Sequence, residues 1–190
     1  MTDSVQEALR YVTSRYAERA LIGFGEGATL CLCACQKAKT EGEERIMPSR
    51  LILNSPFLRV PVNAEQKKQL EVLDRSDVQV PASYLCEDGL YAKVIEDEPE
   101  PYRYLGDLLS GSLSGLPETD IYFGSSENAY ACLPEFLEKC RRENIILHPH
   151  IGEEMMHCWG LYDNCEESKA TIREYIERIR GLDPKKQQER

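Results

Sequence analysis

Three glycines in alternate positions interrupt an apolar segment near the start of this 190-residue chain. Residues 21–30 read Leu-Ile-Gly-Phe-Gly-Glu-Gly-Ala-Thr-Leu. The apolar residues before the glycines predict a buried strand, and the residues after them predict the beginning of a helix. A sharp strand-to-helix turn leaves no room for side chains two residues on either side of its centre, and Gly23 and Gly27 meet that requirement. The centre of the turn is Gly25, which has no side chain that could react.

This layout is that of the nucleophile elbow, G-x-S-x-G, of α/β-hydrolases, in which a serine stands at the centre. A second interpretation is the phosphate-binding turn of a dinucleotide-binding domain, whose looser form allows Ala28 at its last position. That fingerprint also requires an acidic residue at the end of a second strand about 20 residues further on. Residues 37–44 occupy that place and read as a helix end and a loop. The choice between the two interpretations therefore depends on the downstream sequence.

Six further segments occur in a fixed order along the chain. They are residues 4–12 (SVQEALRYV), 51–58 (LILNSPFL), 113–117 (LSGLP), 120–127 (DIYFGSSE), 138–142 (EKCRR) and 154–159 (EMMHCW). They resemble, in the same order, segments of the hormone-sensitive-lipase and acetyl-esterase branch (fold-3) of the α/β-hydrolases. These are the helix before the elbow, the LILISPWLD strand, the SGLPP turn, the GSDE acid loop, the helix after it and the EGMPHVW histidine segment. The resemblance covers nearly the whole chain and implies the C-terminal half of the family's fold.

The resemblance also implies where the family's catalytic groups would lie. His157 stands at the position of the catalytic histidine. Gly25 stands at the nucleophile position and Ser126 at the acid position, so the serine and the aspartate are both replaced. Glu127 follows the acid position and is a substitute acid that could orient His157 through a hydrogen bond. The family's oxyanion motif, HGGG, is not among these 190 residues.

We expect these positions to meet over the C-terminal ends of the strands, where open α/β sheets place their ligand crevice. A serine on the acid loop is a poor nucleophile without a base within about 3 Å and donors that face the developing oxyanion. Ordinary esterase chemistry by this polypeptide alone is therefore not expected. The small pocket that we predict there is lined by Phe24, Glu26, Ser125, Ser126, Glu127 and His157.

The alternation of strand and helix patterns predicts an α/β fold, a truncated hydrolase half-sheet of about four parallel strands flanked by helices. The expected strands are residues 20–25, 50–56, 119–124 and 145–150, and the expected helices are 4–18, 27–40, 64–73, 129–143 and 165–180. A single domain is expected over residues 1–182, with a helical excursion at about 62–118, a solvated acidic loop at 96–101 and a disordered tail at 183–190.

The acidic composition argues against several classes of partner. The formal net charge is −10 at pH 7, and the basic runs are as short as Lys67-Lys68 and Lys185-Lys186. A surface that binds phosphate backbones needs clustered lysine and arginine, so no nucleic-acid partner is predicted. No segment approaches about 18 apolar residues, and the first residues have no basic and apolar leader. We therefore predict no membrane partner and a cytoplasmic location.

Alternating cysteines at Cys31, Cys33 and Cys35 could suggest a metal site. On the expected helix, however, residues two apart point in nearly opposite directions, so the three thiols do not converge on one ion. Packing of small, soft side chains in the core is the better interpretation. Free thiols are expected rather than disulfides.

Alternating histidines at His148 and His150 would share one face of a strand. With His157 or Cys158 nearby a zinc site can be imagined, but a surface pair at the end of a strand is the simpler interpretation. The sequence therefore predicts neither a metal nor a cofactor.

The elbow strand at residues 20–24 raises a question of assembly. Its neighbour in the full fold comes from the N-terminal half, so we expect its edge to be unpaired and apolar, which favours association. The predicted partner is a second copy, in a homodimer formed through residues 20–24, or a chain that carries the N-terminal half. Two functions stay open: a hydrolase-like protein that is inactive alone and acts in binding or assembly, and an ester hydrolase completed by a partner chain or by substitute residues. Gly25 favours the first.

Overall fold

The computed structural model describes residues 2–89, 91–93, 106–163 and 165–181. Its centre is a four-stranded parallel sheet with strand order β1-β2-β3-β4. Each strand follows the previous one through a crossover, so the predicted α/β class and the half-sheet of four parallel strands are confirmed. The strands are β1 (Ala20–Phe24), β2 (Arg50–Asn54), β3 (Glu118–Gly124) and β4 (Leu147–Gly152).

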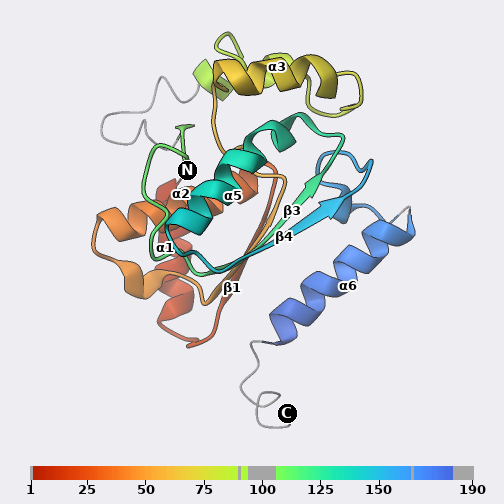
Figure 1. The fold of residues 1–190 in the computed structure, drawn as a ribbon. Coiled ribbons are helices and arrows are strands. Elements are labelled where there is room, and N and C mark those ends of the chain that lie inside the picture. Colours follow the sequence, from red (N-terminus) through yellow and green to blue (C-terminus); the bar gives the residue numbers. More distant parts are fainter. Residues whose placement is uncertain (1, 90, 94–105, 164, 182–190) are drawn as a thin grey trace.

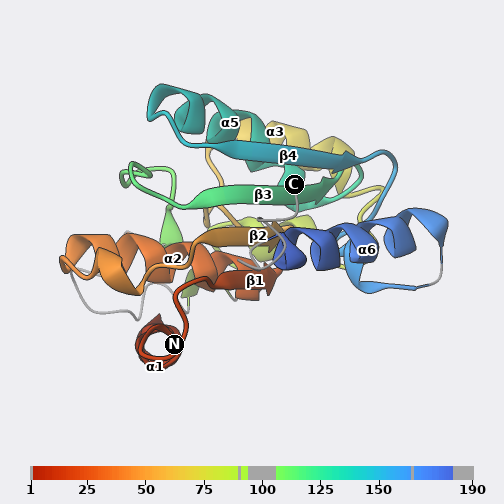
Figure 2. The same cartoon turned by 90° about the horizontal axis from the view of Figure 1, so that it is seen from below.

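Helices cover both faces of this sheet (Figure 1). The helices α1, α2 and α5 lie on one side, α6 lies on the other side, and α3 lies beyond the C-terminal ends of the strands. Figure 2 shows the strands side by side, with β1 at the edge of the sheet and α1 packed beside α2. The bounds are α1 (Thr2–Thr13), α2 (Glu26–Thr40), α3 (Ala64–Leu73), α5 (Leu133–Arg142) and α6 (Glu166–Arg180), with short 3-10 turns η1 (Glu44–Ile46), η2 (Ala82–Leu85), η4 (Asn128–Cys132) and η5 (Trp159–Leu161).

Alternate residues of the strands face two different clusters of apolar side chains, as the two-residue period of a strand requires. Leu53 and Ile121 point into the main core beneath α2 and α5, where both are fully buried. Ile52 and Tyr122 point to the opposite face and pack against Tyr175 of α6. The sheet is therefore covered on both faces, which explains why its central strands read as continuous apolar runs.

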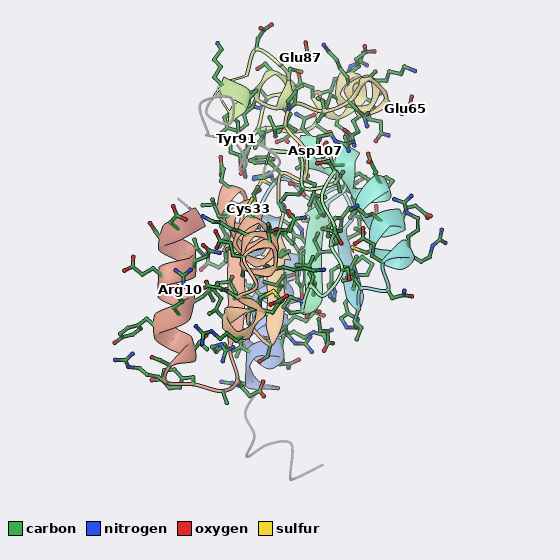
Figure 3. All side chains as sticks on the ribbon, turned by 90° about the vertical axis from the view of Figure 1, so that its left-hand side faces the viewer. Arg10, Cys33, Glu65, Glu87, Tyr91 and Asp107 are labelled. Carbon is green, nitrogen blue, oxygen red and sulfur yellow. The ribbon has the colours of Figure 1, made fainter. Side chains whose placement is uncertain are left out.

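The alternating cysteines of α2 are part of the main core, as predicted. Cys31, Cys33 and Cys35 are all buried there, and Figure 3 shows Cys33 inside the molecule, whereas Arg10 and Glu65 lie at its outside. Burial raises the pKa of Cys31 to about 11 and those of Cys33 and Cys35 to about 12. The described residues contain no disulfide and no cluster of three or more metal-ligating side chains.

Several element boundaries differ from the sequence-based expectation. The first helix ends at Thr13 rather than at residue 18. The strand β2 ends at Asn54 because Ser55 takes a left-handed conformation with a φ of 52°. The strand β4 begins at Leu147 rather than at 145, since the backbone of Ile145 caps α5 by donating to Cys140.

The described part of the excursion between β2 and β3 is helical in places. It contains the helix α3, the short turn η2 and helical residues 91–93, with turns and bends among the other described residues. The predicted acidic loop at 96–101 and the predicted tail at 183–190 lie outside the described residues. Among the helices that the structure describes, none has the length and apolar character needed to cross a membrane.

Candidate active site

The turn between β1 and α2 has the geometry of a sharp strand-to-helix elbow. Gly25 lies at its centre with φ 53° and ψ −124°, a conformation that L-residues rarely adopt. A Cβ atom on Gly23 would lie 2.6 Å from backbone atoms of Ala28, so this position does require glycine. A Cβ atom on Gly27 would meet nothing within 4 Å, so the expected steric reason for glycine at position 27 is wrong.

The imidazole of His157 faces the centre of this elbow. A Cβ atom built on Gly25 would stand 3.1 Å from Nε2 of His157. Segments that are 132 positions apart in the sequence thus meet at the C-terminal end of β1, where the sequence places them. His157 as a whole residue is 6% exposed. The position that holds the reactive serine in a hydrolase elbow is therefore next to a base, but carries no reactive atom.

The other ring nitrogen of His157 is bonded to a buried carboxylate. Nδ1 lies 2.7 Å from Oε2 of Glu127, whose side chain is fully buried. The second oxygen of Glu127, Oε1, accepts hydrogen bonds from the hydroxyl of Ser55 at 2.9 Å and from the backbone N–H of Gly124 at 2.8 Å. The hydrogen bond that the sequence suggests between Glu127 and His157 is present, and both carboxylate oxygens have partners.

Burial and hydrogen bonding together set the protonation of this pair. Burial raises the pKa of Glu127 above its usual value, and hydrogen bonds from His157, Ser55 and Gly124 only partly oppose it. Burial acts to lower the pKa of His157, but the hydrogen bonds with Cys158 and Glu127 outweigh it and raise that pKa to about 10. Both pKa values are raised, so the pair retains a proton at neutral pH.

The sequence analysis named Cys158 only for an imagined zinc site, whereas the structure places its thiol at the elbow. Its sulfur lies 3.6 Å from the point where a Cβ on Gly25 would stand, so the thiol and the imidazole of His157 face the same point. Cys158 has a left-handed backbone with φ 53° and ψ 30°, and its N–H donates to the hydroxyl of Ser55 at 3.0 Å. The only sequence signal is its place directly after His157.

Aromatic side chains cover the imidazole. The ring of Phe57 stacks on that of His157, with centroids 5.3 Å apart and an interplanar angle of 9°. Tyr84 and Tyr91 pack against Phe57 at 5.7 and 5.8 Å. The hydroxyl of Tyr84 donates to Oε1 of Glu26 at 2.9 Å, which ties the excursion after β2 to the first turn of α2.

The remaining predicted site residues do not contact the imidazole as expected. Phe24 points to the opposite face of the sheet and packs edge-on against Tyr175 at 5.8 Å. The hydroxyl of Ser125 accepts from the N–H of Glu154. Ser126 is bonded through its backbone, so the acid bonded to the histidine is Glu127, one residue after the aligned position. Phe57 and Cys158, rather than Phe24 and Ser125, surround His157.

The two alternating histidines share one face of β4, as predicted, and both are bonded to carboxylates of β3. Nε2 of His148 lies 2.8 Å from Glu118, and Nε2 of His150 lies 3.1 Å from Asp120. His150 also stacks on Tyr122 with ring centroids 4.2 Å apart. The histidines contribute packing and hydrogen bonds between neighbouring strands.

Comparison with known proteins gives a result for structure but none for sequence. No protein-family model matches the chain, and no curated protein matches it in sequence. Among solved structures it is similar to the hormone-sensitive-lipase homologue EstE7 from a metagenome library, with a TM-score of 0.81, 22% identity and coverage of 95% of this chain and 61% of that chain. It is also similar to an esterase of the bacterial hormone-sensitive lipase family, with a TM-score of 0.79, 19% identity and coverage of 95% of this chain and 60% of that chain.

A third match is a putative esterase from Staphylococcus aureus, with a TM-score of 0.76, 18% identity and coverage of 90% of this chain and 57% of that chain. The chain thus spans about 60% of the length of the solved esterases that it matches. These likenesses show the fold: the chain has the C-terminal part of the α/β-hydrolase fold, in the form found in esterases of the hormone-sensitive lipase family. The resemblance stated from the sequence motifs is confirmed at the level of the fold.

Proposed function

We propose that this protein is an α/β-hydrolase relative that is catalytically inactive alone and acts in binding or assembly. The observation that carries the proposal is Gly25. The elbow has the backbone geometry of a nucleophile turn, but the residue at its centre has no reactive atom. A Cβ built on this residue would stand 3.1 Å from Nε2 of His157. Ester hydrolysis by a serine mechanism needs a hydroxyl at that position, and no histidine–acid pair can replace it.

The protonation of the histidine supports the same conclusion. A general base must be unprotonated before it can accept a proton from a nucleophile or from water. The pKa of His157 is raised to about 10 by its hydrogen bonds with Cys158 and Glu127. Its imidazole is therefore charged at neutral pH and acts as a hydrogen-bond donor rather than as a base.

The edge of the sheet supports a role in assembly. The strand β1 lies at the edge of the described sheet, and it contains neither a charged residue nor a proline. Ile22, at its centre, is 37% exposed. Unpaired apolar edges favour pairing with another strand. The proposed partner is a second copy of this chain, paired through β1, or a chain that carries the N-terminal half of the fold.

A second candidate function is a carboxylic-ester hydrolase that a partner chain or substitute residues complete. The observation that favours it is the 2.7 Å hydrogen bond between Glu127 and His157 with Nε2 aimed at the elbow. This is the orientation in which an acid holds a histidine for catalysis. A partner chain could supply oxyanion donors, but it could not place a serine on the turn at Gly25.

The two functions are distinguished by turnover of a short p-nitrophenyl ester. We expect the purified protein to show no multiple turnover above the uncatalysed rate. The control is His157→Ala, which removes the base and leaves Gly25 unchanged. Sustained turnover by the natural chain that disappears in His157→Ala would contradict the proposed inactivity and favour the second candidate.

A further inference from the structure

The thiol of Cys158 lies at the same elbow as His157, where the serine is missing. Two reactive groups face the point where a Cβ on Gly25 would stand: Nε2 of His157 at 3.1 Å and Sγ of Cys158 at 3.6 Å. The glycine makes this approach possible, because the two groups converge on the space that a side chain at position 25 would occupy. A sulfur atom is thus present on the side of the histidine where a hydrolase has its serine oxygen.

Neighbouring residues in sequence seldom direct their side chains to one point, and the local backbone explains why these two do. Cys158 has a φ of 53° and a ψ of 30°, the left-handed conformation. Strained conformations of residues other than glycine persist only where the surrounding structure fixes them. Here the hydroxyl of Ser55 accepts from the N–H of Cys158 and also donates to Glu127, so one residue fixes both the cysteine and the acid.

We propose that Cys158 is a nucleophile that accepts acyl groups from small activated esters or thioesters, with His157 and Glu127 as its histidine and acid. This proposal goes beyond the inactivity proposed above, because it requires one acylation and no turnover. Cysteine, histidine and a carboxylate are a recurrent combination in nucleophilic catalysis. Cys158 and His157 are each 6% exposed, which restricts the donor to a small acyl group.

The groups of this site account for the bonds and the proton of the acylation step. Sγ attacks the carbonyl carbon of an aryl ester, an S–C bond forms and the ester C–O bond breaks. The protonated imidazole of His157 gives its Nε2 proton to the leaving aryl oxygen and takes up the thiol proton, so its charge is unchanged, and the product is a thioester on Cys158. The elbow also begins α2. The N–H of Ala28 already donates to the carbonyl of Gly25, which leaves the N–H groups at the very start of the helix as donors for the oxyanion.

The thioester is expected to persist. Its hydrolysis requires an unprotonated imidazole that activates water. Glu127 keeps its hydrogen bond to Nδ1 after acylation, and this bond favours the charged imidazole over the free base. One equivalent of acyl group per chain, without further turnover, is therefore the expected stoichiometry.

The experiment is a burst assay with p-nitrophenyl acetate on the full chain, followed by intact mass measurement and peptide mapping. We expect release of one equivalent of p-nitrophenolate and an acetyl group on the peptide that contains Cys158. Cys158→Ala should abolish the burst, and His157→Gln should slow it by about a hundredfold. The matched control is Cys165→Ala, which removes a more exposed thiol at the N-terminus of α6 and should leave the burst unchanged.

The outcomes separate this inference from the proposed function. No release, or acetyl groups only on Cys86 or Cys165, would overturn the inference and leave the proposed inactivity standing. Sustained turnover that Cys158→Ala abolishes would support Cys158 as the nucleophile, but it would overturn both the expected single equivalent and the proposed inactivity. Mapping of the natural chain, with and without guanidinium chloride, keeps the test valid if a variant fails to fold. If the unfolded chain were still acetylated selectively at Cys158, the folded site would contribute nothing to the reactivity of this thiol. That result would also overturn the inference.

Discussion

Nε2 of His157 lies 3.1 Å from the point where a Cβ atom on Gly25 would stand. This separation is tighter than an ordinary van der Waals contact. A side chain at position 25 would therefore require the imidazole to shift away from the turn. The site thus keeps the placement of an elbow and a base, but its packing is adjusted to glycine. Introducing a serine at position 25 therefore affects both the backbone strain of the turn and the position of the imidazole.

The first prediction is that Gly25→Ser does not create an efficient esterase. The φ of 53° disfavours any side chain at position 25 by about 1–2 kcal/mol, and the imidazole of His157 has to withdraw. Catalysis also needs a free base and the oxyanion donors of the HGGG motif, which is not among these 190 residues. We expect slow labelling by a fluorophosphonate and a melting temperature lower by several degrees. Gly27→Ser is the control, because a Cβ at that position meets nothing within 4 Å.

Rapid labelling of the serine at position 25, at the rate of intact esterases of this fold, would contradict this prediction. It would mean that the site is more complete than its residues indicate.

The second prediction concerns Glu127→Gln. Removing one partner of a buried ion pair leaves the other uncompensated, so we expect a loss of about 3 kcal/mol in the free energy of unfolding. The pKa of His157 should fall below about 10, because the carboxylate that stabilises its charged form is gone. NMR titration of the ring measures the pKa, and denaturant unfolding measures the stability. Glu118→Gln, beside His148, is the matched control and should leave the His157 titration unchanged.

The third prediction is the dependence of stability on pH. The pKa of His157 is raised in the folded protein from 6.5 to about 10. Its contribution is therefore present in full below pH 6.5 and is lost as the pH rises through about 10. The difference in unfolding free energy between the natural chain and His157→Gln should shrink over this window. A difference that is constant or grows from pH 6.5 to 10 would contradict the raised pKa.

The sequence predicted the fold well because its signals are local and repeated. Four apolar runs separated by helical patterns give a parallel sheet, and three of the observed strands begin within one residue of the expected position. The elbow and His157 were also predictable, because glycine spacing and one motif fix them. The substitute acid was predictable as well: Glu127, one residue after the aligned position, was expected to orient His157, and it lies 2.7 Å from Nδ1 of that ring.

Other parts of the site were not predictable because they depend on contacts between distant segments. Phe57 stacks on His157 across 100 positions of sequence, and nothing near Phe57 indicates this. Cys158 points at the elbow because of its left-handed backbone, which no residue type other than glycine signals reliably. Phe24 was placed in the pocket by its proximity to Gly25, but alternate residues of a strand face opposite sides, and it faces α6.

The fourth prediction concerns Glu143, which caps the turn before β3. Oε2 of Glu143 accepts from the hydroxyl of Ser112 at 2.9 Å and from the N–H groups of Leu113 and Ser114 at 2.6 and 2.7 Å. Burial acts to raise the pKa of this carboxyl, but the hydrogen bonds, first that from Lys139, lower it to about 2.

We expect Glu143→Gln to cost about 1–2 kcal/mol near neutral pH, the range for hydrogen bonds to a charged group that is partly solvated. The carboxylate's contribution is present above pH 4.5 and is lost as the pH falls through about 2, so the two proteins should converge in acid. Unfolding by urea at several pH values measures both. Glu138→Gln, whose partner on the same helix is exposed Arg141, is the control and should change stability little.

The last prediction tests assembly through β1. Ile22 is 37% exposed at the centre of this edge strand, and the face of the strand toward α6 carries Phe24. A two-fold axis beside β1 would pair two copies antiparallel and join their sheets, and a self-complementary edge gives such a closed dimer naturally. We expect light scattering to report a dimer at micromolar concentration, or a complex when the N-terminal half of the fold is supplied as a separate chain.

Ile22→Lys places a charge at the pairing edge and should shift the natural assembly toward monomer. Val72→Lys is the control, because this equally apolar residue on α3 is 70% exposed and lies away from β1. A monodisperse monomer whose solubility Ile22→Lys leaves unchanged would refute the assembly proposal, because it would mean that the open edge of β1 is stable in water without a partner.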